Sequence, residues 1–127
     1  MVNNGFVDDA DLALRQSIFE CFAETGAPPE VDDRAGLKRL AAAHVVVLDA
    51  QRRIVMAHPF AAPGGACRVD AGARTWWGNC AWDGLGIVAA LGLHDARVVA
   101  QGVEATDDAV FHVAVPAAAW WEDIGHT

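Results

Sequence analysis

A cysteine and an aspartate stand three residues apart in the segment WWGNCAWDGLG, residues 76–86, and their types suit them to chemistry. TWWGN predicts a strand and CAWDGLGIVAALGLH a helix, so Cys80 falls where the strand gives way to the helix. Unpaired N–H groups and the macrodipole at a helix N-terminus favour a thiolate. Asp83 lies on the same face of the first helical turn. Together, a thiolate and a carboxyl group can hold a soft metal and deliver a proton to a group bound to it.

The same pair also fits a purely structural role. Cysteine is commonly buried without function, and the helix dipole alone favours an acid in the first turn. The CxxD spacing is a weak motif, so the spacing leaves both interpretations open. If the site is functional, we expect Cys80 to be the most reactive of the three cysteines, because only Cys80 is expected at a helix N-terminus.

Other side chains could complete or line such a site. Cys67 lies on the preceding predicted strand, and a tight turn could bring it to the helix start as a second metal ligand; it also fits as a small core residue. A histidine on a strand or loop can shuttle protons, bind metal or fill a structural role. Aromatic rings can wall a pocket, although most of their area is expected in the core. The candidates for a proton shuttle or a pocket wall are His58, Phe60, Trp77, Trp82 and His112.

The elements that must position these residues begin with two strands, at 67–71 and 75–79, around the turn GAR. The helix over 80–94 follows, then strands over 96–103 and 109–116 and a last helix from Pro116. This order predicts an α+β fold with a mixed, mainly antiparallel sheet and a central helix.

The N-terminal part is predicted to be helical. Residues 9–25 carry Leu14, Ile18 and Phe22 at helical spacing, with Asp9 or Asp11 as the cap and Gly26 at the end. Residues 31–44 predict a second helix, capped by Asp32 or Asp33, with Leu37 and Leu40 pointing inward; residues 44–60 predict two strands around the turn DAQR. Helix, helix and hairpin resemble a trimmed winged-helix unit. We therefore expect a winged-helix-like unit over 1–60 and an α+β core over 61–127, forming one compact body.

Composition narrows the function classes. The 127 residues carry nine Lys and Arg against seventeen Asp and Glu, a formal net charge of −8, which disfavours nucleic acid as a partner. A basic leader and a long apolar run are both missing, so we expect a cytoplasmic protein without a membrane partner. Three cysteines without a framework spacing predict reduced thiols. Without CxxC or HExxH, a structural zinc site is not predicted.

Several blocks of the sequence resemble the organomercurial (alkylmercury) lyase family. The segment NCAWDGLGIVAALG resembles the active-site segment of that family, VMAHPFAA its strand and following loop, and VFHVAVPAAAWWEDIGHT its late strand and helix. The resemblance implies protonolysis of a carbon–mercury bond without an organic cofactor, with Hg(II) as product. It implies that Cys80 binds mercury and that Asp83 relays the proton to carbon.

The sequence also departs from the family pattern. The second catalytic cysteine usually follows soon after the WWxDI block, but WWEDIGHT contains no thiol. An external thiol, or Cys67, would then have to complete the ligand set. Two alternatives stay open: a lyase-fold enzyme that acts on an organic small molecule, as a cyclase or isomerase with Asp83 as acid or base, and a non-catalytic metal or ligand binder. The expected partners are a small-molecule substrate and an external thiol, and a homodimer stays open.

Overall fold

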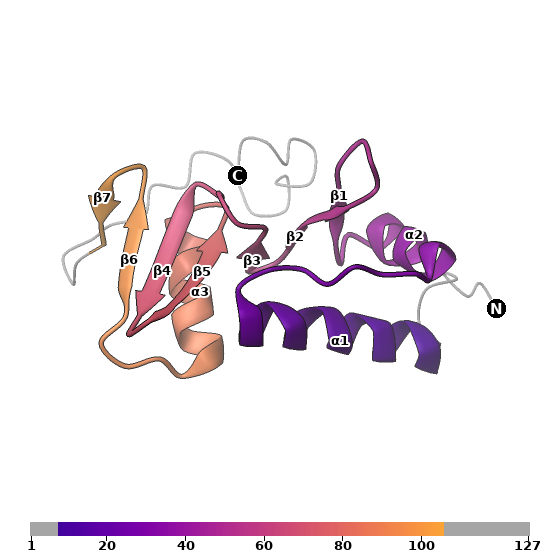
Figure 1. The fold of residues 1–127 in the computed structure, drawn as a ribbon, viewed down its shortest axis with the longest axis horizontal. Helices are drawn as coiled ribbons and strands as arrows, with labels where there is room; N and C mark the ends of the chain where they lie inside the picture. Colours follow the sequence, from indigo (N-terminus) through magenta and orange to yellow (C-terminus); the bar gives the residue numbers. More distant parts are fainter. Residues whose placement is uncertain (1–7, 106–127) are drawn as a thin grey trace.

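The computed structural model describes residues 8–105 (Figure 1). The predicted strand over 109–116, the predicted last helix and His112 lie outside the described residues. Three helices and seven strands make up the described part: α1 (Asp9–Thr25), α2 (Arg34–Ala42), β1 (Val47–Leu48), β2 (Ile54–Ala57), β3 (Phe60–Ala61), β4 (Cys67–Ala71), β5 (Arg74–Gly78), α3 (Ala81–Leu91), β6 (Arg97–Ala100) and β7 (Val103–Glu104).

The strands form one sheet in the order β1-β2-β3-β5-β4-β6-β7, and each strand pair in the described range is antiparallel. The α+β class with a mainly antiparallel sheet is therefore confirmed for residues 8–105. The predicted division between residues 60 and 61 falls inside β3, and the sheet runs through it without a break.

Helix α1 begins and ends at local sequence signals. Asp8, rather than Asp9 or Asp11, caps the helix, and its Oδ1 accepts a hydrogen bond of 2.7 Å from the backbone N–H of Asp11. A capping side chain must precede the N–H groups that it satisfies, and Asp9 and Asp11 already lie in the first turn. At the other end Gly26 has a φ of 75°, a conformation that favours glycine, and it ends the helix as predicted.

Helix α2 has the predicted cap and core residues. The Asp33 side chain accepts from the backbone N–H of Gly36, and Leu37 and Leu40 are buried. An ion pair joins α2 to α1: Arg39 donates two hydrogen bonds from Nε and one from Nη2, of 2.8–3.2 Å, to the carboxylate of Asp11, which is 1% exposed. A buried carboxylate without a partner would destabilise the fold strongly, and the Arg39 guanidinium prevents this by pairing with it.

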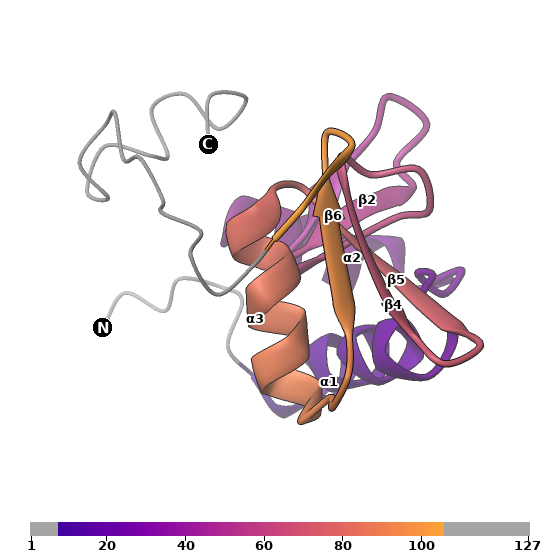
Figure 2. The same cartoon turned by 90° about the vertical axis from the view of Figure 1, so that its left-hand side faces the viewer.

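Helix α3 covers one face of the sheet. Figure 2 shows α3 against one side of β4, β5 and β6. On that side Val69 pairs with Trp76 and with Val98, and all three are buried. The indole N–H of Trp76 donates to the carbonyl of Ala23 in α1 at 2.9 Å, which ties α1 to the same core. Side chains alternate along a strand, so Trp77 must point to the other face.

The end of the described sheet differs from the prediction of one strand over 96–103. Gln101 and Gly102 have positive φ values of 53° and 78°, and they turn the chain between β6 and β7. Two successive residues in this region make a tight hairpin turn. The sequence QG is thus a turn, and Val103 begins a new strand.

Candidate functional site

Cys80 lies at the junction of β5 and α3, as the sequence predicts. Cys80 is the N-cap residue of α3, with an extended backbone, and is partly buried. Burial raises the pKa of the Cys80 thiol, although the backbone N–H groups of Asp83 and Trp82 oppose that shift. The direction is opposite to the one expected from the helix N-terminus alone, because desolvation of the sulfur outweighs the stabilisation of a thiolate by those N–H groups.

Asp83 is held between the end of β5 and the turn that joins β2 to β3. Its residue is 9% exposed, and Oδ2 accepts a hydrogen bond of 3.3 Å from the backbone N–H of Asn79. The other oxygen, Oδ1, lies 3.6 Å from Nδ1 of His58. That separation allows an ion pair when the imidazole is protonated but is too long for a direct hydrogen bond. A nearly buried carboxyl group thus faces a partly exposed imidazole, an arrangement that can move a proton between solvent and the site.

Cys67 lies against the same turn of α3. It opens β4, opposite Gly78 in β5, and its residue is 0% exposed. A Cβ added at Gly84 would stand only 2.5 Å from the Cys67 Sγ, so the sulfur is packed directly on the helix backbone. Burial raises the pKa of the Cys67 thiol to about 11, and repulsion by a negative charge on Cys80 or Asp83 contributes to the rise. The hairpin therefore brings Cys67 to the helix start.

Two glycines make this close approach possible. A Cβ at Gly78 would lie 3.0 Å from the Cβ of Asp83 and 3.3 Å from the backbone nitrogen of Gly84. A side chain at either glycine would push α3 away from β4 and β5, and would separate Cys67 from Asp83. The sequence GLG at Gly84–Gly86 predicts close helix packing, and the contact of Gly84 with Cys67 confirms it; Gly78, near the end of a predicted strand, gives no comparable signal.

The site is thus a two-thiol cluster with an acid and a base: Cys67, Cys80, Asp83 and His58. Within residues 8–105, no group of three or more His, Cys, Asp or Glu side chains is arranged to hold a metal ion. The cluster combines two thiols with one carboxyl group and one imidazole. Its chemistry is that of two soft donors beside a proton-transfer pair.

The three aromatic candidates within the described residues differ in their surroundings. Phe60 is 4% exposed and stacks on Phe22 of α1, with ring centroids 5.4 Å apart, so it belongs to the core. Trp77 is half-buried on the face of the sheet opposite α3, where it pairs with Ala61 and Arg68. Trp82 is 59% exposed on α3. Phe60 is thus packed against α1, and strand alternation turns Trp77 to the other face of the sheet; an aromatic wall beside Asp83 stays a prediction.

All three cysteines are free thiols, as the sequence predicts. Cys21 lies on α1, near Thr25, and takes no part in the cluster of Cys67 and Cys80. No helix within residues 8–105 combines the length and the apolar character needed to cross a bilayer. Comparison with protein-family models, with curated proteins and with solved structures gave no match to this chain.

Proposed function

We propose that this protein cleaves carbon–mercury bonds in the manner of an organomercurial lyase, with Cys80 and Cys67 as the mercury ligands and Asp83 as the proton donor. One observation carries the proposal: Cys80 and Asp83 stand in the first turn of α3, and the Cys67 sulfur is packed against the same turn at Gly84. Mercury is a soft cation that thiolates bind well, and two sulfurs suffice for linear Hg(II). Cys67 would fill the role for which WWEDIGHT offers no cysteine.

The proposed reaction balances without a redox step. The sulfur of Cys80 attacks the mercury of R–Hg–X, displaces X⁻ and gives up its proton to the Asp83 carboxylate. Asp83 then donates that proton to the carbon while the carbon–mercury electron pair stays on carbon, and R–H leaves. The Cys67 thiol loses its own proton as its sulfur binds mercury. The sum is R–Hg–X plus two thiols giving R–H, one dithiolate-bound Hg(II), H⁺ and X⁻.

The two raised thiol pKa values fit this order of events. A thiol that stays protonated at neutral pH carries the proton that the carbon needs, and binding to a soft cation is what removes it. His58 at 3.6 Å from Asp83 would take up the proton released at the end. A small external thiol, as a cytoplasmic setting supplies, would then extract Hg(II). We also propose that residues 1–60 form a winged-helix-like unit. In support of this, α1, α2, β1 and β2 follow one another in the order helix, helix, hairpin.

Benzene release from phenylmercury tests the proposal. We expect about one benzene per chain without added thiol, and repeated turnover with excess small thiol. Asp83→Asn should stop benzene release but retain Hg(II) binding, whereas Cys80→Ser should lose both. Cys67→Ala should lower Hg(II) retention, and the matched control Cys21→Ser should behave as wild type. An Asp83→Asn protein that releases benzene at the wild-type rate would refute the proposal.

A second candidate rests on the pair of Asp83 and His58, which needs no thiol. A nearly buried carboxyl group 3.6 Å from an imidazole suits general acid–base catalysis on an organic molecule, as in a cyclase or isomerase. In that case Cys80→Ser would leave turnover of the organic substrate nearly intact, while Asp83→Asn and His58→Gln would abolish it. If the protein binds Hg(II) through Cys80 but turns over neither class of substrate, a non-catalytic metal binder is the function that remains.

A further inference from the structure

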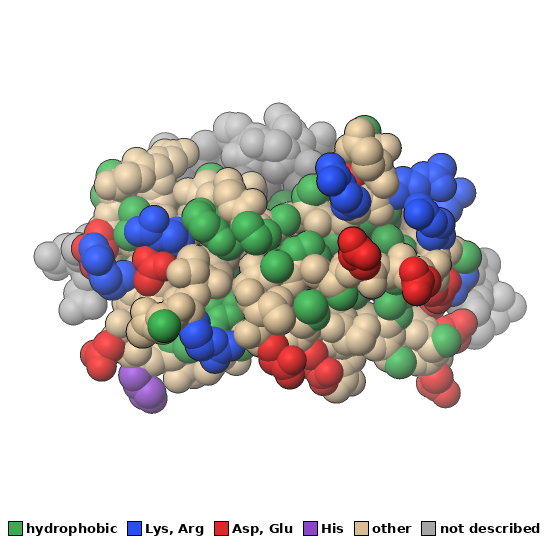
Figure 3. Space-filling model, in the orientation of Figure 1, with side chains coloured by type: hydrophobic (Ala, Val, Ile, Leu, Met, Phe, Trp, Pro, Cys, Tyr) green, Lys and Arg blue, Asp and Glu red, His purple; other side chains and the backbone are tan. Residues whose placement is uncertain are grey.

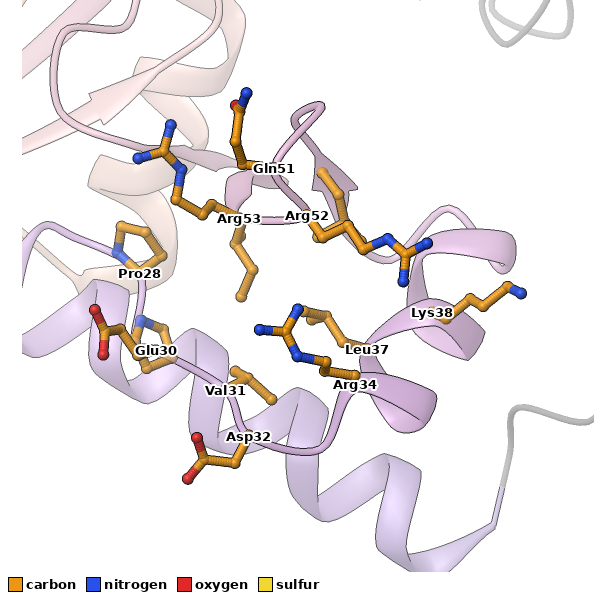
Figure 4. Close-up of a pocket in the computed structure, with 13 residues that line it drawn as sticks. Pro28, Glu30, Val31, Asp32, Arg34, Leu37, Lys38, Gln51, Arg52 and Arg53 are labelled. Atoms are coloured by element: carbon orange, nitrogen blue, oxygen red, sulfur yellow. The ribbon is translucent and has the colours of Figure 1, made fainter.

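A cavity of about 490 Å³ lies beside α2 (Figure 4), at the end of the molecule away from α3 (Figure 1), where Figure 3 shows Lys and Arg side chains grouped. The chain between α1 and α2, the helix α2 itself and the turn between β1 and β2 enclose it. Its floor is apolar, and is made by Val31, Leu37, Leu48 and Ile54. The volume is within the range of sites that bind one small molecule.

The rim of this cavity is rich in basic residues, although the protein as a whole has a net charge of −8. Four of the chain's nine basic residues line it: Arg34, Lys38, Arg52 and Arg53. Arg53 pairs with Asp49 at 3.0 Å. The other three cations have no carboxylate partner among residues 8–105. Their charge is therefore available to a bound anion.

One basic side chain is directed into the cavity. Figure 4 shows the guanidinium of Arg34 reaching toward the middle of the cavity. The two lining carboxylates, of Glu30 and Asp32, point away from it in the same view. An anion in the cavity would thus lie closer to the Arg34 guanidinium than to the carboxylate of Glu30 or Asp32. The planar fork of a guanidinium binds carboxylate, phosphate or sulfonate oxygens in pairs.

The turn that carries Arg52 is held in shape by Asp49. The Asp49 side chain accepts hydrogen bonds of 2.9 Å and 2.8 Å from the backbone N–H groups of Gln51 and Arg53. The backbone N–H of Arg52 donates to the Asp49 carbonyl at 2.9 Å. These bonds hold Arg52 in a left-handed conformation, with a φ of 61°. The backbone that carries Arg52 at the rim is therefore fixed before any ligand arrives, which lowers the cost of binding.

We infer that this cavity binds a small organic anion: an acid group held by Arg34, with the basic residues Lys38 and Arg52 farther out on the rim, and an apolar body against Val31, Leu37, Leu48 and Ile54. The site is separate from the thiol cluster, and the inference does not depend on the proposed mercury chemistry. Nucleic acid is disfavoured because the rest of the acidic surface would repel a polyanion.

Titration of the ¹⁵N-labelled full chain with octanoate, followed by amide chemical shifts, tests the inference. We expect saturable shifts at Leu37, Leu48 and Ile54, with a Kd of about 0.1 to 1 mM. The neutral probe 1-octanol should bind at least several-fold more weakly. Arg34→Gln should weaken octanoate binding about tenfold, since it removes a charge-assisted hydrogen bond. Arg34→Lys should recover part of that loss.

Arg97→Gln is the matched control, because Arg97 is also exposed but pairs with Glu104 on β6 and β7. It should leave the octanoate Kd unchanged. The spectra themselves report whether each variant is folded. The inference would be overturned by equal affinities for octanoate and 1-octanol, by an unchanged Kd in a folded Arg34→Gln protein, or by shifts that saturate only outside the cavity. Preferential binding of a short oligonucleotide at the same amides would also overturn it.

Discussion

Replacing Gly84 with alanine tests the contact on which the candidate site depends. Cys67 can lie beside Asp83 only if α3 sits on β4 as closely as the structure describes. A Cβ at position 84 would stand 2.5 Å from the Sγ of Cys67 and 2.7 Å from a methyl carbon of Val98. Both neighbours are buried in strands, so neither can swing aside into solvent.

The expected loss of stability combines two opposing effects. Overpacking a close-packed core by one methyl group costs about 1 to 3 kcal/mol. Alanine in place of glycine inside a helix gains about 1 kcal/mol from helix propensity. Because two contacts fall well below van der Waals distance, we expect the cost to lie in the upper part of its range, and Gly84→Ala to lower the free energy of unfolding by about 1 to 2 kcal/mol.

Gly86→Ala is the matched control in the same helix. A Cβ there would meet the nearest atom of Pro59 at 3.4 Å, an ordinary contact. This variant should therefore keep the propensity gain and stabilise the protein by up to about 1 kcal/mol. Urea unfolding followed by tryptophan fluorescence and circular dichroism gives both free energies, and an unchanged m-value shows that they refer to the same transition.

A double-mutant cycle with Cys67→Ala identifies the clashing atom. If the sulfur is the obstacle, the cost of Gly84→Ala should shrink in the Cys67→Ala background, with a coupling of about 1 kcal/mol. A Gly84→Ala protein as stable as Gly86→Ala would refute the reasoning, since α3 would then stand farther from β4 than described. Zero coupling would show that Cys67 does not touch the helix at Gly84.

Further predictions concern the buried groups. Since the pKa of Cys67 is about 11 in the folded protein against 9.0 for a free thiol, folding takes up a proton between these values. The free energy of unfolding should fall from pH 9 to pH 11 by at most about 2 to 3 kcal/mol, and Cys67→Ala should abolish that share of the fall in urea titrations. Alkylation with iodoacetamide, mapped by mass spectrometry, should modify the partly buried Cys80 faster than Cys67 at neutral pH; the opposite order would contradict the described burial. Arg39→Gln should lower the melting temperature clearly, because it leaves the buried Asp11 carboxylate without its partner. As Arg39 lowers the pKa of Asp11 below 3.8, wild type should lose this contribution only as the pH falls below that value, and equal acid unfolding curves for both proteins would contradict it. Asp33→Ala should cost about 1 kcal/mol by removing the α2 cap, as measured by urea unfolding.

Local signals were enough to predict the three helices of the described residues. Gly26 ends α1, Asp33 caps α2, and the change from TWWGN to an apolar run places Cys80 at the start of α3. Such signals act between residues a few positions apart, so the sequence alone displays them. The prediction of one strand over 96–103 was wrong because the turn residues Gln101 and Gly102 were not recognised.

Contacts between distant segments could not be predicted in the same way. Sequence alternation requires Trp76 and Trp77 to face opposite sides, but only the packing of α1 decides that Trp76 is the buried one. Likewise, the approach of His58 to Asp83 depends on β3 pairing with β5.

The acidity of the thiols also depends on tertiary structure. From the sequence, Cys80 has the position of a helix cap, which favours a thiolate. In the folded chain the strands beside α3 remove water from both sulfurs, and the pKa values of Cys67 and Cys80 rise. The sequence by itself determined which residues could react and where Cys80 stands along the chain. Only the tertiary structure decided which groups meet and how strongly they hold their protons, because desolvation and charge proximity arise when segments far apart in sequence pack together.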